Sequence, residues 1–166
     1  MIQTETKTIP TGDRGAYATL REMRRLVLKS MASVMVLDEA KQIIRSVGGK
    51  NRLAQAQAIA GYMASSLRFV RDPWGVELIH TPEFMIERIH RNGMYEADCD
   101  DYAILSAALA KAIGLRTKFV ILGFAGSSGP WSHVYTIAET PQGWVPFDVS
   151  FGIPDGAITR KAYYEV

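Results

Sequence analysis

The chain has 166 residues and a formal net charge of +2, which is the size of one domain. Hydrophobic residues make up 48% of it and charged residues 22%, values typical of a globular protein and not of a disordered one. The near-neutral charge argues against a nucleic-acid partner, since nucleic-acid-binding domains are usually far more basic. A single cysteine excludes intrachain disulfides and cysteine-rich metal sites, so the surroundings of that thiol become the main question.

The N-terminal residues are polar and predict no signal peptide. Residues 1–12 lack the apolar core of an export signal, and we expect them to form a flexible arm. Apolar runs elsewhere are too short to span a bilayer, which argues against a membrane partner and favours a cytoplasmic or phage-particle location.

The charge is distributed unevenly along the chain. Residues 1–52 carry ten Lys or Arg against five Asp or Glu, a net charge of +5, and the remaining residues have a net charge of −3. Two solvated helix faces would explain this difference. The alternative is a basic N-terminal segment that docks a partner protein.

Apolar residues at helical spacing predict helices in the first half of the chain. The first stripe consists of Leu20, Met23, Val27, Met31 and Val34. We expect a second helix from Asp38 to about Val47, a third over residues 51–68, and a short one that begins at Pro82 and ends near Asn92.

The second half predicts one long helix followed by strands. The helix spans residues 99–113 and stops at Gly114. Strands are expected over 117–124, 132–139 and 144–149, and Pro146 places the last of them at an edge or a bulge. Helices followed by an antiparallel sheet indicate an α+β fold. We expect one domain over residues 13–166, with 13–47 as added helices and 50–150 as the core.

Cys99 stands at the predicted start of the long helix. Asp98 is a candidate N-cap, and Asp101 follows it at the spacing of a capping box. The positive end of the helix dipole favours a thiolate here, and the first backbone N–H groups could bind an oxyanion. The neighbouring carboxylates of Asp98, Asp100 and Asp101 oppose ionisation, so activation requires an imidazole close by.

His133 and Asp148 could complete a catalytic triad with Cys99. If the turn at 140–143 closes a hairpin, the numbers of paired residues add up to about 283, which places Asp148 opposite Tyr135 and diagonal to His133. A His133–Asp148 hydrogen bond would fix the ring tautomer and leave the other ring nitrogen facing the thiol.

These motifs, in this order, resemble the transglutaminase-like superfamily of papain-like cysteine enzymes. The resemblance covers residues 50–150 and is carried by the segments DCDDYA (98–103), GL (114–115), SHV (132–134), GW (143–144) and FD (147–148). It implies a helix packed on an antiparallel sheet, with Cys99 as nucleophile, His133 as base and Asp148 orienting the histidine. The segment 72–77, with Pro82 beyond it, resembles the small phage and prophage members.

Two positions depart from the family pattern. Ala97 stands where the family often has glycine before the Asp-Cys pair, and Val149-Ser150 follows Asp148 where many members have proline.

The resemblance implies acyl chemistry on a peptide or protein amide through a thioester intermediate. Water as the acceptor gives a peptidase or amidase and an amine gives a transglutaminase, and we favour hydrolysis. The Cys99 backbone N–H would bind the oxyanion. Upstream side chains are candidates for the second donor, Tyr95 first and then Trp74 and Asn92. The loop before His133 could contact substrate through Gly126, Ser127, Ser128 and Trp131, although for Trp131 we favour packing over substrate contact.

No cofactor or metal is expected. The three aspartates around Cys99 lack the glycine turn and further ligands of a calcium loop, and His80 and His90 are expected to be surface or capping residues. The rival to an enzyme is an inert structural or interaction module that keeps the same scaffold, since fold alone does not fix function.

Overall fold

The computed structural model describes residues 8–73, 77–126, 131–148 and 155–166. Residues 1–7 of the predicted arm at 1–12, Trp74 and the loop serines 127 and 128 lie outside them. Its elements are α1 (Gly12–Ser30), α2 (Val34–Ile43), α3 (Arg52–Ser66), β1 (Leu67–Phe69), α4 (Pro82–Asn92), β2 (Tyr95–Ala97), α5 (Cys99–Ala112), β3 (Thr117–Phe124), β4 (His133–Thr140), β5 (Gly143–Phe147), a 3-10 turn (Asp155–Ala157) and β6 (Ile158–Glu165). These elements confirm the α+β class.

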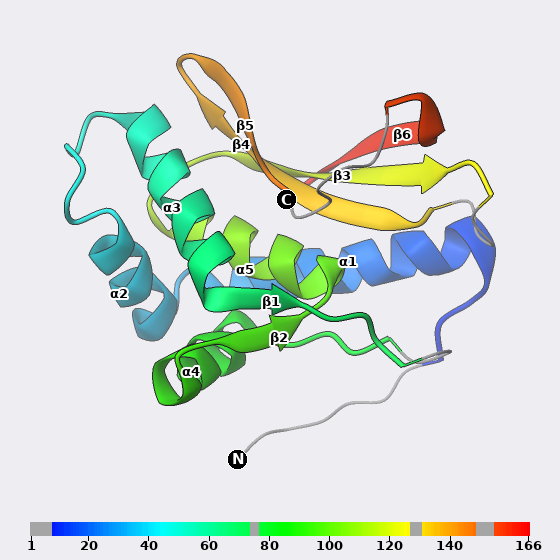
Figure 1. Cartoon of the computed structure of the whole chain (residues 1–166), viewed down its shortest axis with the longest axis horizontal. Coiled ribbons are helices and arrows are strands. Elements are labelled where there is room, and N and C mark those ends of the chain that lie inside the picture. The colour runs from blue at the N-terminus through cyan, green and yellow to red at the C-terminus, as the bar shows by residue number, and fades with distance from the viewer. Residues whose placement is uncertain (1–7, 74–76, 127–130, 149–154) are drawn as a thin grey trace.

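Helix α5 is the centre of the fold (Figure 1). The four-stranded sheet, in the order β5-β4-β3-β6, lies on one side of it, and α1, α2 and α4 lie on the other. Every residue from Asp100 to Ala110 is buried, which explains why α5 shows little amphipathic contrast. Small residues of α5 let the sheet approach closely, and the Thr136 hydroxyl of β4 donates a 2.7 Å hydrogen bond to the Ala103 carbonyl.

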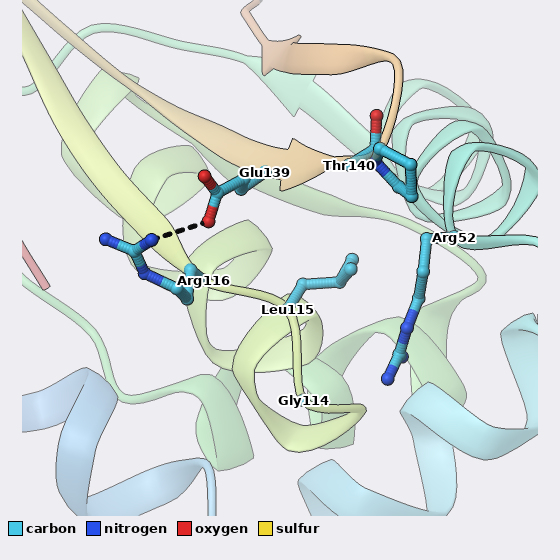
Figure 2. A pocket seen from close by; sticks show the side chains of 7 residues that line it. Arg52, Gly114, Leu115, Arg116, Glu139 and Thr140 are labelled. Carbon is cyan, nitrogen blue, oxygen red and sulfur yellow. Dashed lines mark hydrogen bonds and ion pairs between the residues drawn. The ribbon is translucent and has the colours of Figure 1, made fainter.

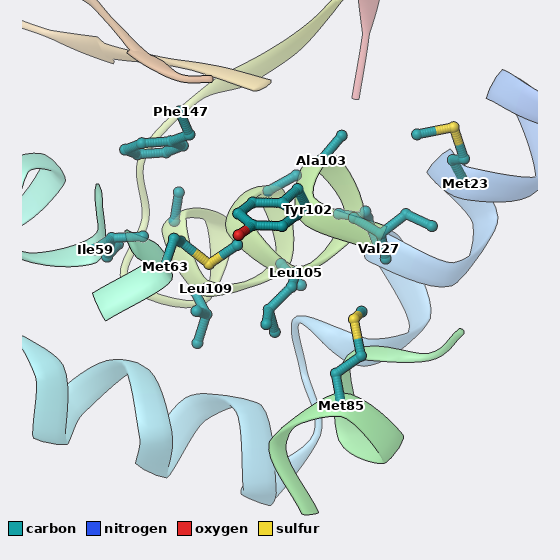
Figure 3. Close-up of a cluster of buried hydrophobic side chains, with 14 of the residues drawn as sticks. Met23, Val27, Ile59, Met63, Met85, Tyr102, Ala103, Leu105, Leu109 and Phe147 are labelled. Atoms are coloured by element: carbon teal, nitrogen blue, oxygen red, sulfur yellow. The ribbon is translucent and has the colours of Figure 1, made fainter. Parts of the chain in front are cut away.

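The added N-terminal helices share the core of α5. Met23 and Val27 of α1 are fully buried, and Figure 3 shows them beside Leu105 and Met85 in one apolar cluster. Burial of such side chains contributes about 1.5–3 kcal/mol each. Residues 13–47 therefore contribute to the stability of the core in addition to whatever other role they have.

The predicted second helix was placed wrongly. α2 begins at Val34, four residues before Asp38, because Ser33 caps it by accepting the Val36 N–H. Helix α1 ends at Ser30, so Met31 and Val34 do not continue its apolar stripe, and Val34 is 74% exposed.

The predicted β4–β5 hairpin has the expected register. Thr136 pairs with Phe147 and Thr140 with Gly143, so the numbers of paired residues add up to 283. Pro146 lies in the edge strand β5, as expected for a residue without an N–H. Two features of the sheets were not predicted: β6, which pairs antiparallel with β3, and the short parallel pair β1–β2.

In the part of the chain that the structure describes, no helix has both the length and the apolar character that crossing a bilayer requires.

Candidate active site

Cys99 is the first residue of α5, at the helix end that faces the start of β4. The Asp98 carboxylate caps this helix by accepting the N–H groups of Asp100 at 3.1 Å and Asp101 at 3.2 Å. The side chain of Asp98 accepts the N–H groups of Asp100 and Asp101 and not that of Cys99. The Cys99 N–H lies at the N-terminus of α5, where it could bind an oxyanion.

The surroundings of the Cys99 thiol disfavour its ionisation. Burial raises its pKa well above the ordinary value, and the carboxyl groups of Asp100 and Asp98 raise it further. A hydrogen bond from the Val134 backbone N–H lowers the pKa but does not offset the other contributions. The thiol is therefore protonated at neutral pH and points at Asp100, with 3.7 Å between Sγ and Oδ1.

His133 and Asp148 form the hydrogen bond that the hairpin register predicted. Nε2 of His133 lies 2.7 Å from Oδ1 of Asp148, and the imidazole is only 7% exposed. The ring also lies between Phe124 and Tyr135, with centroid distances of 6.4 and 5.9 Å and nearly parallel planes. Aromatic contacts on both faces and a hydrogen bond at Nε2 fix the orientation of the ring and leave Nδ1 as the second nitrogen.

Cys99 lies beside the backbone at the start of β4, the strand that carries His133. The Val134 N–H that reaches Cys99 belongs to the residue directly after His133, which brings α5 and β4 together at this point. Within the described residues, however, no hydrogen bond joins the Cys99 sulfur to the His133 ring. The Val134 side chain packs in the main core with Cys99, whereas the His133 ring lies beside Phe124 and Tyr135, which pack in a second apolar cluster. A contact between the thiol and the imidazole therefore stays a prediction.

The acidic neighbours of Cys99 have partners of their own. Asp101 does not close a capping box, because its carboxylate binds the backbone N–H and the Nδ1 of His80 at 2.9 and 2.8 Å. Asp100 is buried beside Glu77, and desolvation together with that contact raises its pKa well above the ordinary value. Sequence reasoning treated His80 as a surface residue, since nothing in the spacing of residues 80 and 101 indicated a contact.

Four other candidates lie within the described residues, and one of them, Asn92, is the last residue of α4. The Tyr95 ring meets His80 and Phe84 edge-on, each at 5.8 Å, so its place as second oxyanion donor stays a prediction. Trp131 packs against the main core, and the Arg160 guanidinium lies 4.3 Å from its ring centroid. These contacts favour packing for Trp131. Gly126 lies in a turn with a φ of 78°, a conformation that suits glycine.

Ala97 fits the place where the family often has glycine. It ends β2, pairs with Phe69 and is buried. Among the described residues, no non-glycine residue has a positive φ, so the turn into Cys99 imposes no strain on alanine.

Two surface cavities lie away from the thiol. One, of about 350 Å³, is at the opposite end of α5, where Figure 2 shows Arg52 and the Arg116–Glu139 ion pair around it. The other, of about 390 Å³, lies along α1 and is lined by Tyr17, Arg14 and Arg21. Neither includes Cys99, His133 or Asp148, so the candidate triad is not at the bottom of either cavity.

Metal binding has no support in the described part of the chain. No group of three or more His, Cys, Asp or Glu side chains there is arranged to hold an ion.

Comparisons with known proteins concern the family and the fold of the chain. A family model described as the transglutaminase-like superfamily matches residues 41–149. A solved structure from Parabacteroides distasonis, titled a "putative protease", matches with a TM-score of 0.57 and 12% identity, over 80% of this chain and 26% of that one. At this identity the likeness concerns the fold, and the match spans about a quarter of that protein's length. No curated protein matches the chain.

Proposed function

The chain belongs to the transglutaminase-like superfamily, and from this premise we propose that it is a thiol-dependent enzyme that cleaves a peptide or protein amide. The observation that carries the proposal is the His133–Asp148 hydrogen bond at 2.7 Å, formed one residue from the N–H that binds Cys99. Cys99 is the nucleophile, His133 the base and Asp148 the group that orients the base.

Acylation begins with a proton transfer, because the raised pKa of Cys99 leaves the thiol protonated. The side chain turns from Asp100 toward Nδ1 of His133, which takes the thiol proton as the sulfur attacks the amide carbonyl carbon. A C–S bond forms, the Cys99 N–H binds the oxyanion, and the imidazolium gives its proton to the leaving nitrogen as the C–N bond breaks.

Water completes the cycle in the hydrolytic reaction that we propose. His133 takes a proton from water, whose oxygen attacks the thioester carbon. The C–S bond then breaks, and the sulfur regains the proton. An amine in place of water would give transamidation by the same steps.

One observation favours a second candidate, an inert interaction module on the same scaffold. The Cys99 sulfur faces Asp100 and not the imidazole, and burial keeps its pKa high. A thiol that stays in this state does not turn over substrate. In that reading the basic N-terminal helices, whose charge favours an acidic partner, would carry the function.

Alkylation of Cys99 across pH distinguishes the two candidates. In the enzyme, His133 assists ionisation, so the native thiol reacts with iodoacetamide near neutral pH and His133→Ala slows that reaction at least tenfold. His90→Ala is the matched control, because His90 also binds a carboxylate at 2.7 Å, that of Glu39, but on α4 and α2. If the thiol reacts equally in wild type and His133→Ala, the enzyme proposal is wrong. If His133→Ala slows the reaction as expected, mass spectrometry of acyl adducts on Cys99 would identify the donor class.

A further inference from the structure

A second histidine–carboxylate pair lies at the first turn of α5. His80 holds both oxygens of the Asp101 carboxylate: its backbone N–H donates to Oδ1 at 2.9 Å and its Nδ1 lies 2.8 Å from Oδ2. The Asp101 side chain is only 3% exposed, so it depends on these partners for the hydrogen bonds that water would otherwise supply.

An aromatic cluster holds the His80 ring in this position. The ring stacks on Phe84 of α4 with centroids 5.2 Å apart, and Tyr95 of β2 meets both rings edge-on at 5.8 Å. Strand β2 ends at Ala97, two residues before Cys99. The cluster therefore connects α4 and β2 with His80, and His80 in turn binds Asp101 in the first turn of α5, the turn that carries Cys99.

We propose that His80 is a positioning residue, which fixes Cys99 at the start of α5 through the Asp101 carboxylate. The inference rests on the proposed function, since it assigns His80 to the same site. His80 touches neither the thiol nor the triad in the described contacts, and it acts by holding the first turn and by balancing a buried negative charge beside it.

The charges around His80 support the second part of this role. Its hydrogen bond to Asp101 raises its pKa, burial opposes that rise, and the carboxylates of Asp101, Asp72 and Asp98 add to it. On α4, the Arg88 guanidinium lies 5.0 Å from the centroid of the Phe84 ring that stacks on His80. A positively charged His80 offsets part of the acidic field that disfavours the Cys99 thiolate.

The test compares the pH dependence of Cys99 alkylation by iodoacetamide in four proteins. His80→Ala should move the midpoint of the profile upward by about one pH unit, which corresponds to a roughly tenfold slower reaction below the midpoint. His80→Asn should restore part of the rate, because its side-chain N–H can occupy the place of Nδ1, while the part that depends on the positive charge of His80 stays lost. His90→Ala should leave the wild-type profile unchanged.

An unchanged profile in His80→Ala, an equal shift in His90→Ala, or a failure of His80→Asn to restore any of the lost rate would each overturn the proposal. If His80→Ala does not fold, His80→Leu keeps apolar bulk against Phe84 and Tyr95 while removing the donor, and the same criteria apply to it. The proposed function fails separately, through an unchanged profile in His133→Ala, since thiol titration requires no turnover.

Discussion

The wild-type protein should lose stability as pH rises from about 4 to 7, because Asp98 ionises over this range. The Asp98→Asn variant should not show this loss. Burial raises the pKa of Asp98 from 3.8 to about 7, with a smaller upward contribution from Asp101, while the hydrogen bond from the Asp101 N–H lowers it. Asparagine keeps a side-chain oxygen that caps α5, so the substitution removes the ionisation and preserves the cap.

The sign follows from proton linkage. The folded state holds the Asp98 proton more tightly than the unfolded state, so the stabilising contribution is complete below pH 3.8 and is lost as pH rises to about 7. One pKa unit corresponds to about 1.4 kcal/mol, so a shift of roughly three units corresponds to about 4 kcal/mol at most. Above pH 7 the difference between the two proteins should be constant.

Urea unfolding followed by tryptophan fluorescence at pH 4, 5, 6, 7 and 8 measures this difference. The free energy of unfolding of Asp98→Asn, relative to wild type, should rise by up to about 4 kcal/mol between pH 4 and 7. Asp38→Asn, at an exposed position on α2, controls for the loss of one negative charge. Parallel pH curves for wild type and Asp98→Asn, or a difference that grows toward low pH, would refute the reasoning.

Two further predictions concern the core and the N-terminal helix. Thr136→Val should lower the free energy of unfolding by about 1 kcal/mol in urea, because it leaves the Ala103 carbonyl without its 2.7 Å donor; an unchanged midpoint would show that this hydrogen bond adds nothing. Gly15→Ala should destabilise the protein by about 1–3 kcal/mol, or displace residues 8–10, because the added Cβ would lie 1.9 Å from the Pro10 carbonyl oxygen. Thermal unfolding and limited proteolysis test the second change, and wild-type behaviour in both would contradict the close packing of Pro10 on α1.

Local signals in the sequence determined several elements. Thr81 accepts the Phe84 N–H, Pro82 takes the first helical position and Gly93 adopts a left-handed φ of 79°, so α4 has the bounds that these residues predict. The β4–β5 register was predictable for the same reason, since a two-residue turn fixes which residues face each other. The His133–Asp148 contact follows from that register.

Competing local signals led to the misplaced second helix. Ser33 and Asp38 are both good N-cap residues, and the sequence offers no way to rank them. The tertiary structure decides between them, because a start at Ser33 buries Val36 and Ala40.

Contacts between distant segments were decided by the tertiary structure alone. Strand β6 pairs with β3 across about forty residues, and its mixed polar sequence carries no strong strand pattern because it lies at an edge of the sheet. The sequence by itself placed Cys99 at a helix start and His133 and Asp148 on one hairpin, because caps and turns act over a few residues. The folded chain decided that the thiol faces Asp100 and that His80 binds Asp101, because burial and long-range packing set the partners of a charged side chain.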